Sequence, residues 1–200
     1  MKIIRAFTIV LVSFWVFTAC KSSKNTSEKN TRKKDPMAAE AALRLGQMFD
    51  KLANDLVAAT DNKVDVVRIA DGIDITFQPD FSFESSSEQL TQDAKDHLQN
   101  ISGVLNRYPY TEIFIEGHAD SSGNQLKNKK LSELRAKTVA LFLKNNGVVA
   151  ERLAIAGYGA IRPIESNATP EGRRRNRRVV VKIRANEKKF LETAAMVNNK

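Results

Sequence analysis

The chain contains one cysteine, Cys20, and two histidines, His97 and His118, among its 200 residues. A lone cysteine cannot form an internal disulfide, and no second thiol exists to share a metal ion with it. Long apolar runs are missing as well, because Ala6–Val16 is interrupted by two polar residues and falls short of the ~20 residues that a bilayer-spanning helix needs. These absences exclude a disulfide-rich scaffold and a cysteine-rich zinc domain.

The start of the chain has the layout of an export signal. Lys2 and Arg5 precede the apolar run, and Phe17-Thr18-Ala19 then leads into Cys20. An apolar segment followed by small residues and a cysteine resembles the lipobox of bacterial lipoproteins. The resemblance implies that residues 1–19 are removed and that Cys20 carries the lipid, although an incidental cysteine in an uncleaved anchor is the alternative. Several fatty chains hold a protein firmly to a membrane, whereas one chain does not.

Composition indicates a globular protein with an excess of positive charge. Hydrophobic residues make up 42% of the chain and charged residues 28%, which is ordinary for a packed domain. The formal net charge of +9 favours an anionic partner such as nucleic acid, lipid headgroups or an acidic polymer. Charge alone does not choose among these partners.

Two segments separate the signal from the main domain. Residues 20–36 are expected to form the lipidated cysteine and a flexible linker, since residues 21–36 contain no large apolar side chain that could support folding. Residues 37–63 are predicted to be an amphipathic helical segment, with apolar residues at steps of three and four, and to pack on the main domain or on a copy of itself. These apolar residues are Leu45, Met48, Phe49, Leu52 and Leu56.

Residues 64–186 alternate strand and helix patterns and form the predicted main domain. Alternating apolar residues on both sides of Asp71-Gly72 indicate a hairpin, and the later strands and helices follow by period. The fold class is therefore α+β, a mixed four-stranded sheet with helices packed on one face. Residues 187–200 are expected to be a C-terminal tail. Beyond the hairpin at 64–77, the predicted elements are helices at 87–105 and 126–146 and strands at 111–116, 153–156 and 178–183.

One pattern of residues extends through this domain in a fixed order. It resembles the OmpA-like peptidoglycan-binding domain, the type found at the OmpA C-terminus, in Pal and in MotB, and the resemblance runs from about Val64 to Ala185. Two positions depart from the family, namely Ala119, where threonine is usual, and Lys127, where an aromatic residue often precedes the asparagine. The matching residues are Ile115-Glu-Gly-His-Ala-Asp120, Gly123, Asn128, Leu131-Ser132, Arg135-Ala136, Gly157-Tyr-Gly159, Pro163, Asn167, Gly172-Arg173 and Asn176-Arg-Arg-Val179.

The resemblance implies a binding site for diaminopimelate, the amino acid that crosslinks cell-wall peptides. The family's binding aspartate and arginine fall on Asp120 and Arg135. The far end of diaminopimelate is a zwitterion, so a carboxylate suits its ammonium group and a guanidinium suits its carboxylate through two parallel bonds. Asn128 is assigned to the same site, and three further residues are expected to support it: Ser132, Asn176 and Arg177.

Helix spacing agrees with this assignment. Asn128, Ser132 and Arg135 are separated by four and three residues, so on a helix they share one face near its start. A helix N-terminus also offers free amide groups and a partial positive charge, both of which favour a carboxylate. Packing positions are expected beside this face, at Leu131, Leu134, Thr138 and Leu141.

Catalysis and nucleic-acid binding are alternative interpretations of the same region. Glu116, His118 and Asp120 alternate and would share one face of a strand, as in a metal site, but the other histidine lies on another helix. Nothing like a nucleophile elbow surrounds Ser121 or Ser122. We therefore predict no enzyme activity, no metal and no cofactor, and we expect His118 to hold the end of the strand by hydrogen bonds. The arginine run 172–178 has no interleaved aromatic residue, and an exported chain does not ordinarily meet nucleic acid.

The sequence thus predicts a non-enzymatic lipoprotein of the outer membrane that faces the periplasm and binds peptidoglycan. Lys21 follows the lipidated cysteine, whereas an aspartate there would, by the usual enterobacterial rule, retain the protein in the inner membrane. The alternative is a wall-anchoring subunit of a larger envelope machine such as a stator or a secretion system. The sequence does not identify a protein partner or an oligomeric state.

Overall fold

A computed structural model describes residues 36–60, 64–78, 82–84 and 87–198. The predicted signal peptide, Cys20 and most of the predicted linker lie outside these residues. The described residues form one compact unit. Its elements in chain order are α1 (Pro36–Ala59), β1 (Asp65–Ile69), β2 (Gly72–Phe77), α3 (Gln92–Arg107), β3 (Thr111–His118), α4 (Gln125–Asn145), a 3-10 turn (Ala150–Arg152), β4 (Leu153–Gly159), α5 (Pro170–Asn176), β5 (Arg178–Ala185) and α6 (Glu187–Asn198).

The strands form one mixed sheet in the order β1-β2-β5-β3-β4. β3 and β4 run parallel, and the other neighbouring strands run antiparallel. The predicted α+β class is confirmed, but the predicted count of four strands is wrong. Both halves of the hairpin join the sheet, because the tight turn at Ala70-Asp71 keeps Val67 opposite Asp74 and makes β1 a fifth, edge strand.

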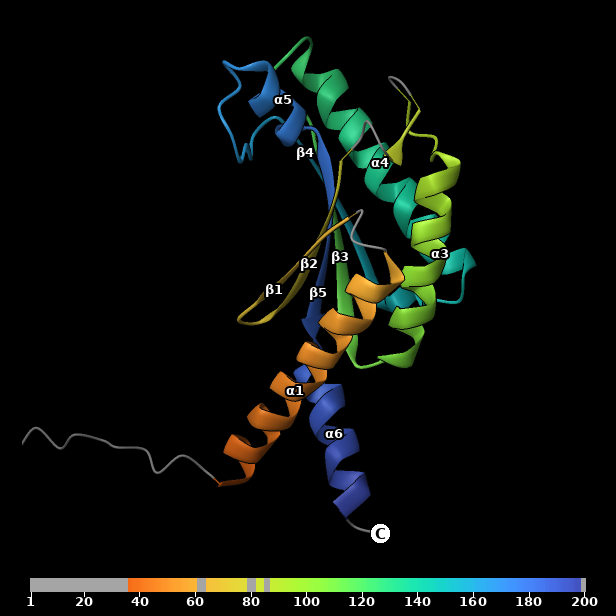
Figure 1. The fold of residues 1–200 in the computed structure, drawn as a ribbon, viewed down its shortest axis with the longest axis vertical. Coiled ribbons are helices and arrows are strands. Elements are labelled where there is room, and N and C mark those ends of the chain that lie inside the picture. Colours follow the sequence, from red (N-terminus) through yellow and green to blue (C-terminus); the bar gives the residue numbers. More distant parts are fainter. Residues whose placement is uncertain (1–35, 61–63, 79–81, 85–86, 199–200) are drawn as a thin grey trace, which may run out of the picture. The chain divides into compact units, whose positions relative to one another are not determined.

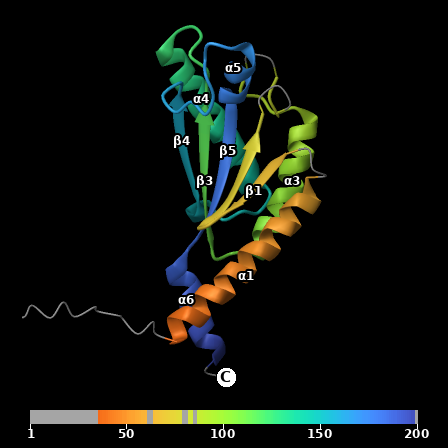
Figure 2. The ribbon, with the colours of Figure 1, turned by 60° about the vertical axis from the view of Figure 1, so that its left-hand side comes forward.

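Helices α1, α3 and α4 pack on one face of the sheet, as predicted (Figures 1 and 2). Strand residues alternate between the faces, so every second side chain of β2, β3 and β5 enters the core beneath these helices. No helix in the described ranges combines the length and apolar character that a membrane crossing requires. The core side chains from the three strands are Ile73, Ile75, Phe77, Ile113, Ile115, Val179, Val181 and Ile183.

Two glycines bring α4 unusually close to the sheet. A Cβ atom on Gly117 of β3 would lie 1.9 Å from the backbone oxygen of Ser132, and one on Gly157 of β4 would lie 2.5 Å from the backbone nitrogen of Glu133. Only glycine permits this approach. Gly147 follows the helix with a φ of 92°, the left-handed conformation expected just after a helix end.

The packing stripe of α4 differs from the predicted one. None of the four predicted packing positions is buried, and Leu141 is 47% exposed. Where the two glycines bring α4 close to the sheet, a different side of the helix faces the strands. The prediction was wrong because it placed the leucine-rich side of α4 against the sheet. The buried residues are Ser132, Arg135, Ala136, Val139 and Leu143.

Three helices differ from their predicted form. α3 begins at Gln92 rather than Ser87, because Thr91 caps it and the preceding residues turn back in a bridge between Phe83 and Leu90. α5 forms in the arginine run, where no helix was predicted. The segment predicted as a tail contains α6.

Arg152 is a buried cation that connects α3, β3 and the start of β4. Its side chain donates to the carbonyls of Thr111 (2.8 Å), Leu105 (3.1 Å) and Tyr108 (3.0 Å), and to the Thr111 hydroxyl at 2.7 Å. The residue is 6% exposed, and burial lowers its pKa. Four hydrogen bonds compensate for the loss of water around the guanidinium.

Candidate functional site

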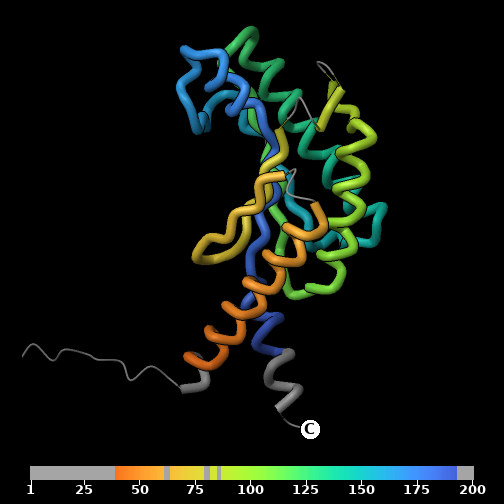
Figure 3. Tube along the Cα trace, in the orientation of Figure 1, coloured from red at the N-terminus to blue at the C-terminus, as the bar shows by residue number. Residues whose placement is uncertain are grey.

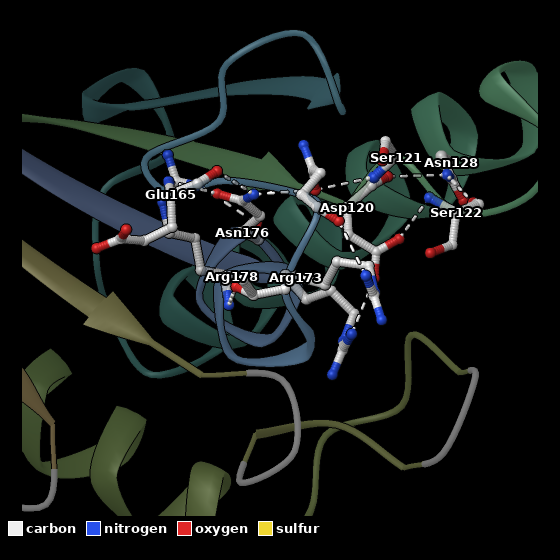
Figure 4. Close-up of polar contacts among 12 residues, drawn as sticks. Asp120, Ser121, Ser122, Asn128, Glu165, Arg173, Asn176 and Arg178 are labelled. Atoms are coloured by element: carbon white, nitrogen blue, oxygen red, sulfur yellow. Dashed lines mark hydrogen bonds and ion pairs between the residues drawn. The ribbon is translucent and has the colours of Figure 1, made fainter.

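The loop that follows β3 holds a buried carboxylate. Asp120 is 7% exposed and lies two residues beyond the end of the strand. Its Oδ1 accepts a hydrogen bond from the Ser122 backbone N–H at 2.8 Å, and its Oδ2 pairs with Nη1 of Arg177 at 2.8 Å (Figure 4). Residues 57 positions apart in the chain therefore meet at this carboxylate.

The first turn of α4 fixes this loop. Asn128 donates from Nδ2 to the backbone oxygens of Asp120 (3.1 Å) and Ser122 (2.7 Å). The helix begins after Asn124, whose side chain accepts from the Lys127 N–H at 3.0 Å. The predicted proximity of Asn128 to Asp120 is thus present in the structure.

Two opposing effects set the ionisation of Asp120. Burial is the larger single effect and acts to raise its pKa. The hydrogen bonds from Arg177 and Ser122, together with the charge of Arg177, outweigh burial and hold the pKa of Asp120 below its ordinary value. The site therefore contains an ionised carboxylate at neutral pH, suited to accept from an ammonium group.

Ser132 and Arg135 continue the same face of α4. The Ser132 hydroxyl donates to the Lys129 carbonyl at 2.8 Å and accepts from the Gly159 N–H at 2.9 Å, which ties α4 to the end of β4. Arg135 is 8% exposed, and its Nε donates to the Ser87 carbonyl at 2.9 Å. Arg135 therefore anchors the segment before α3 on the helix.

Arg135 lies about 10 Å along the helix axis from Asn128, at 1.5 Å per residue. Its guanidinium carbon lies 5.0 Å from the ring centroid of Phe83. Helical side chains lean toward the N-terminus of their helix. Asn128 holds the Asp120 loop at that end of α4, whereas the guanidinium of Arg135 contacts Ser87 and Phe83.

Asn176 is the structural centre of the loop between β4 and α5. It is fully buried, and its Oδ1 accepts from the N–H groups of Ile164 (2.8 Å) and Glu165 (3.0 Å). Its Nδ2 donates to the Glu165 carbonyl at 2.8 Å and to Oδ1 of Asn167 at 2.9 Å. Asn167 Oδ1 in turn accepts from the Ser121 N–H at 3.2 Å, so the two loops are joined (Figure 4).

Several contributors were not found by sequence reasoning. Arg173 donates to the Asn167 carbonyl at 2.9 Å and holds the same loop, although sequence reasoning included it only as a residue matching the family and assigned it no role at the site. Phe83 and Ser87 contact Arg135 from a segment in which no pattern pointed to the site. Tertiary packing alone brings that segment to α4.

His118 does not hold the strand end by hydrogen bonds, and that prediction was wrong. Both ring nitrogens are buried without a hydrogen-bond partner among the described residues. The ring stacks on Tyr158 with centroids 5.4 Å apart, and Nε2 lies 3.7 Å from Oε2 of Glu116. Burial is the main reason that the pKa of His118 falls to about 3, so the ring is neutral. Glu116 pairs instead with Lys182 at 2.8 Å.

Ser121 and Ser122 hold the site through their backbones, and the Ser122 side chain also hydrogen-bonds Asp120. The Ser121 N–H donates to Asn167, and the Ser122 N–H and carbonyl contact Asp120 and Asn128. Within the described residues, no three His, Cys, Asp or Glu side chains are grouped so that they could hold a metal ion. The arrangement is a charged junction between two loops, held together by hydrogen bonds.

The chain is similar in sequence to known bacterial proteins over part of its length. Probable lipoprotein YiaD of Escherichia coli K12 is 38% identical over 120 residues, which cover 60% of this chain and 55% of that protein. Peptidoglycan-binding protein ArfA of Mycobacterium tuberculosis is 41% identical over 86 residues, covering 43% of this chain and 26% of ArfA. The chain thus spans about half or less of the length of these curated relatives.

A solved structure with the same fold is the cell wall anchor of the T6SS from Pseudomonas aeruginosa. It has 29% sequence identity and a TM-score of 0.59, and the alignment covers 68% of this chain and 96% of that one. Residues 82–177 match the OmpA family, and they contain Asp120, Asn128, Arg135 and Arg177. Residues 82–177 are therefore an OmpA-family domain.

Proposed function

We propose that this chain binds peptidoglycan non-covalently by holding the diaminopimelate of the stem peptide at the Asp120 end of the sheet. The observation that carries the proposal is a carboxylate that is buried yet ionised, with Arg177 and the Ser122 N–H each 2.8 Å from one of its oxygens. The names of ArfA and of the T6SS cell wall anchor support a wall ligand for this domain type.

The chemistry of the ligand matches the charges that line the site. The ammonium group of the zwitterion pairs with Asp120, and its carboxylate pairs with the planar guanidinium of Arg135. Asn128 fixes the backbone of the aspartate loop, and Ser132 fixes α4 against β4 between the two charges. Asn176 and Arg177 support the site from the opposite loop.

The proposed role is binding without catalysis. His118 is buried and neutral, and its neighbour Tyr158 stacks on it instead of opening the ring to a substrate. Ser121 and Ser122 hold the loop by hydrogen bonds to Asn167 and Asp120. Incubation of the protein with muropeptides should leave their mass spectrum unchanged, and a cleavage product that disappears on His118→Gln or Glu116→Gln substitution would overturn this part.

The proposed location is the outer membrane, with a lipid on Cys20 and the domain in the periplasm. The small-residue approach to a lone cysteine supports lipidation, and YiaD is itself named a probable lipoprotein. Cys20→Ser should abolish fatty-acid labelling and release the protein from the membrane fraction. Label that persists in the variant would show that another residue is the acceptor.

A second candidate function is that of a wall-anchoring subunit in a larger envelope machine. The likeness to the T6SS cell wall anchor favours it. The two candidates share the same wall site and differ in their protein partners. Recovery of the protein from detergent-solubilised membranes as part of a stoichiometric complex would favour the machine, and recovery without partners would favour the independent tether.

The direct test of the site is titration of the purified chain with a stem peptide that contains diaminopimelate. Asp120→Asn should weaken binding because an amide cannot neutralise the ammonium group. Arg135→Lys should weaken binding nearly as much as Arg135→Ala, because an ammonium group cannot form the two parallel hydrogen bonds that a guanidinium forms with a carboxylate. Hydrogen bonds to charged groups contribute roughly 1.5–3 kcal/mol each, so the loss should be on the order of tenfold or more.

Arg174→Lys is the matched control, since Arg174 is an exposed arginine near the site. It should bind the stem peptide as the parent does. Unchanged affinity in both Asp120→Asn and Arg135→Lys, with the fold intact by circular dichroism, would show that the zwitterion is held elsewhere.

A further inference from the structure

The first half of α1 lies at the margin of the hydrophobic core. The buried residues of this helix are Phe49, Leu52 and Leu56, which are 2%, 0% and 0% exposed and all lie in its second half. From residue 39 to residue 48 no side chain is buried, and Leu43 is 62% exposed. Leu45 and Met48 pack against the margin of the core but are only half-buried, so part of the apolar side of this stretch stays uncovered.

α6 lies beside this stretch, at the end of the sheet opposite α5 (Figures 1, 2 and 3). Asn186 fixes the start of α6 because its N–H donates to the Tyr110 carbonyl and its side chain donates to Glu112, both at 2.8 Å. Leu191 of α6 is 49% exposed. An apolar groove separates the two helices and is lined by Ala41, Ala42, Leu45, Glu187, Phe190 and Leu191.

Two helices alone cannot enclose the apolar side that they share. Helical bundles bury such surfaces with three or four helices around a common core, and an exposed apolar patch with a polar rim marks an interaction surface. Ala41 and Ala42 are small, so a further helix can approach the groove closely. The groove is therefore an apolar surface on which further helices can pack.

The charges beside the groove indicate which partner fits it. We define the end pair as residues 39–48 of α1 and 187–192 of α6. The end pair contains three acidic and three basic side chains, whereas the whole chain has a net charge of +9. An anionic lipid surface or polymer would call for a cationic face, but a balanced face can meet a copy of itself without repulsion. The six charged residues are Glu40, Arg44, Glu187, Lys188, Lys189 and Glu192.

We propose that the end pair is a homodimer interface, in which α1 and α6 of two copies form a four-helix bundle. A two-fold contact uses the same surface on both copies, and this closes the assembly at two. α5 and the Asp120 loop lie at the other end of the sheet (Figure 2). If the proposed wall binding holds, two such copies grip two stem peptides at once, and avidity exceeds the affinity of one site.

Chemical cross-linking in isolated membranes tests the interface with the full chain. Cys20 is the sole native cysteine, so the parent chain gives the baseline for a bismaleimide reagent. Leu191→Cys should yield a covalent product of twice the chain mass that contains peptides of this chain alone. Arg174→Cys, an exposed position near the wall site, should yield none above baseline.

The second part of the cross-linking experiment places a charge inside the groove. Ala42→Glu places a carboxylate in the apolar contact and should reduce the Leu191→Cys product about tenfold, because an unpaired charge is costly to bury. Gln47→Glu adds the same charge at an exposed position of α1 outside the groove and should leave the product unchanged. No Leu191→Cys product, a product with peptides of another protein, or equal effects of the two glutamates would each overturn the proposal. Because wall binding is not measured, failure here leaves the wall site standing.

Discussion

Acidification should destabilise the folded protein through His118. The imidazole side chain is 2% exposed and stacks on Tyr158. Burial is the main cause that lowers the pKa of this ring from 6.5 to about 3, and the nearby charges of Arg178, Lys182 and Arg162 add to it. Between these two pKa values the ring is protonated in the unfolded chain and neutral in the folded chain.

The sign and size of the effect follow from linkage. Between about pH 6.5 and 3 the unfolded state binds more protons than the folded state, so the free energy of unfolding falls as the pH falls. At pH 5 the two pKa values give a loss of about 2 kcal/mol relative to pH 7.5 from this residue. Glu116 faces the ring at 3.7 Å, but Lys182 pairs with that carboxylate at 2.8 Å.

Urea unfolding at pH 7.5 and pH 5 measures this loss. His118→Phe keeps an aromatic ring against Tyr158 and removes the titrating group, so the variant should lose about 2 kcal/mol less than the parent between the two pH values. His97→Gln is the control for the other histidine and should retain the loss seen in the parent. Equal losses in the parent and in His118→Phe would refute the assignment of the effect to this ring.

Three further predictions follow from the packing. Gly117→Ala should lower the free energy of unfolding by about 3 kcal/mol or more, because the new Cβ meets the Ser132 carbonyl. A Cβ on Gly103 has nothing within 4 Å, so Gly103→Ala should leave stability equal or higher. Urea unfolding of both variants compares them. Arg152→Lys should destabilise the protein by about 2 kcal/mol or more, because one ammonium cannot reach the acceptors of the guanidinium, and a thermal melt reports it. Arg177→Met removes a group that lowers the pKa of Asp120, so binding of stem peptide should be lost at a higher pH than in the parent; an unchanged midpoint would contradict this.

The sheet was predictable because its signals are local. Strands β3 and β5 carry short apolar runs, and alternation around Asp71-Gly72 located the hairpin. These patterns depend on neighbours in sequence, which a periodicity of two residues captures. The strand count was wrong because the predicted hairpin was counted as one strand, whereas it supplies both β1 and β2.

Parts of the site were less accessible to sequence reasoning. The resemblance indicated Asp120 and Arg177, but not that they form an ion pair. Ser132 was expected as a support, yet its place between α4 and β4 depends on the absent side chain of Gly117. His118 was assigned hydrogen bonds because polar groups usually have them, and its stacking on Tyr158 depends on a strand 40 residues away.

The arginine run shows how a fold can separate charges that are adjacent in sequence. Arg173 and Arg175 lie on α5, where the first holds the Asn167 carbonyl and the second pairs with a glutamate at 3.1 Å. Arg177 leaves the helix and reaches Asp120. Arg178 begins β5 and is 6% exposed, with hydrogen bonds to backbone carbonyls. A change from helix to strand thus sends these four guanidiniums in different directions, and each of the four meets a partner within the chain. The run is dense because a loop, a buried carboxylate and a strand end must all be held at one point of the fold.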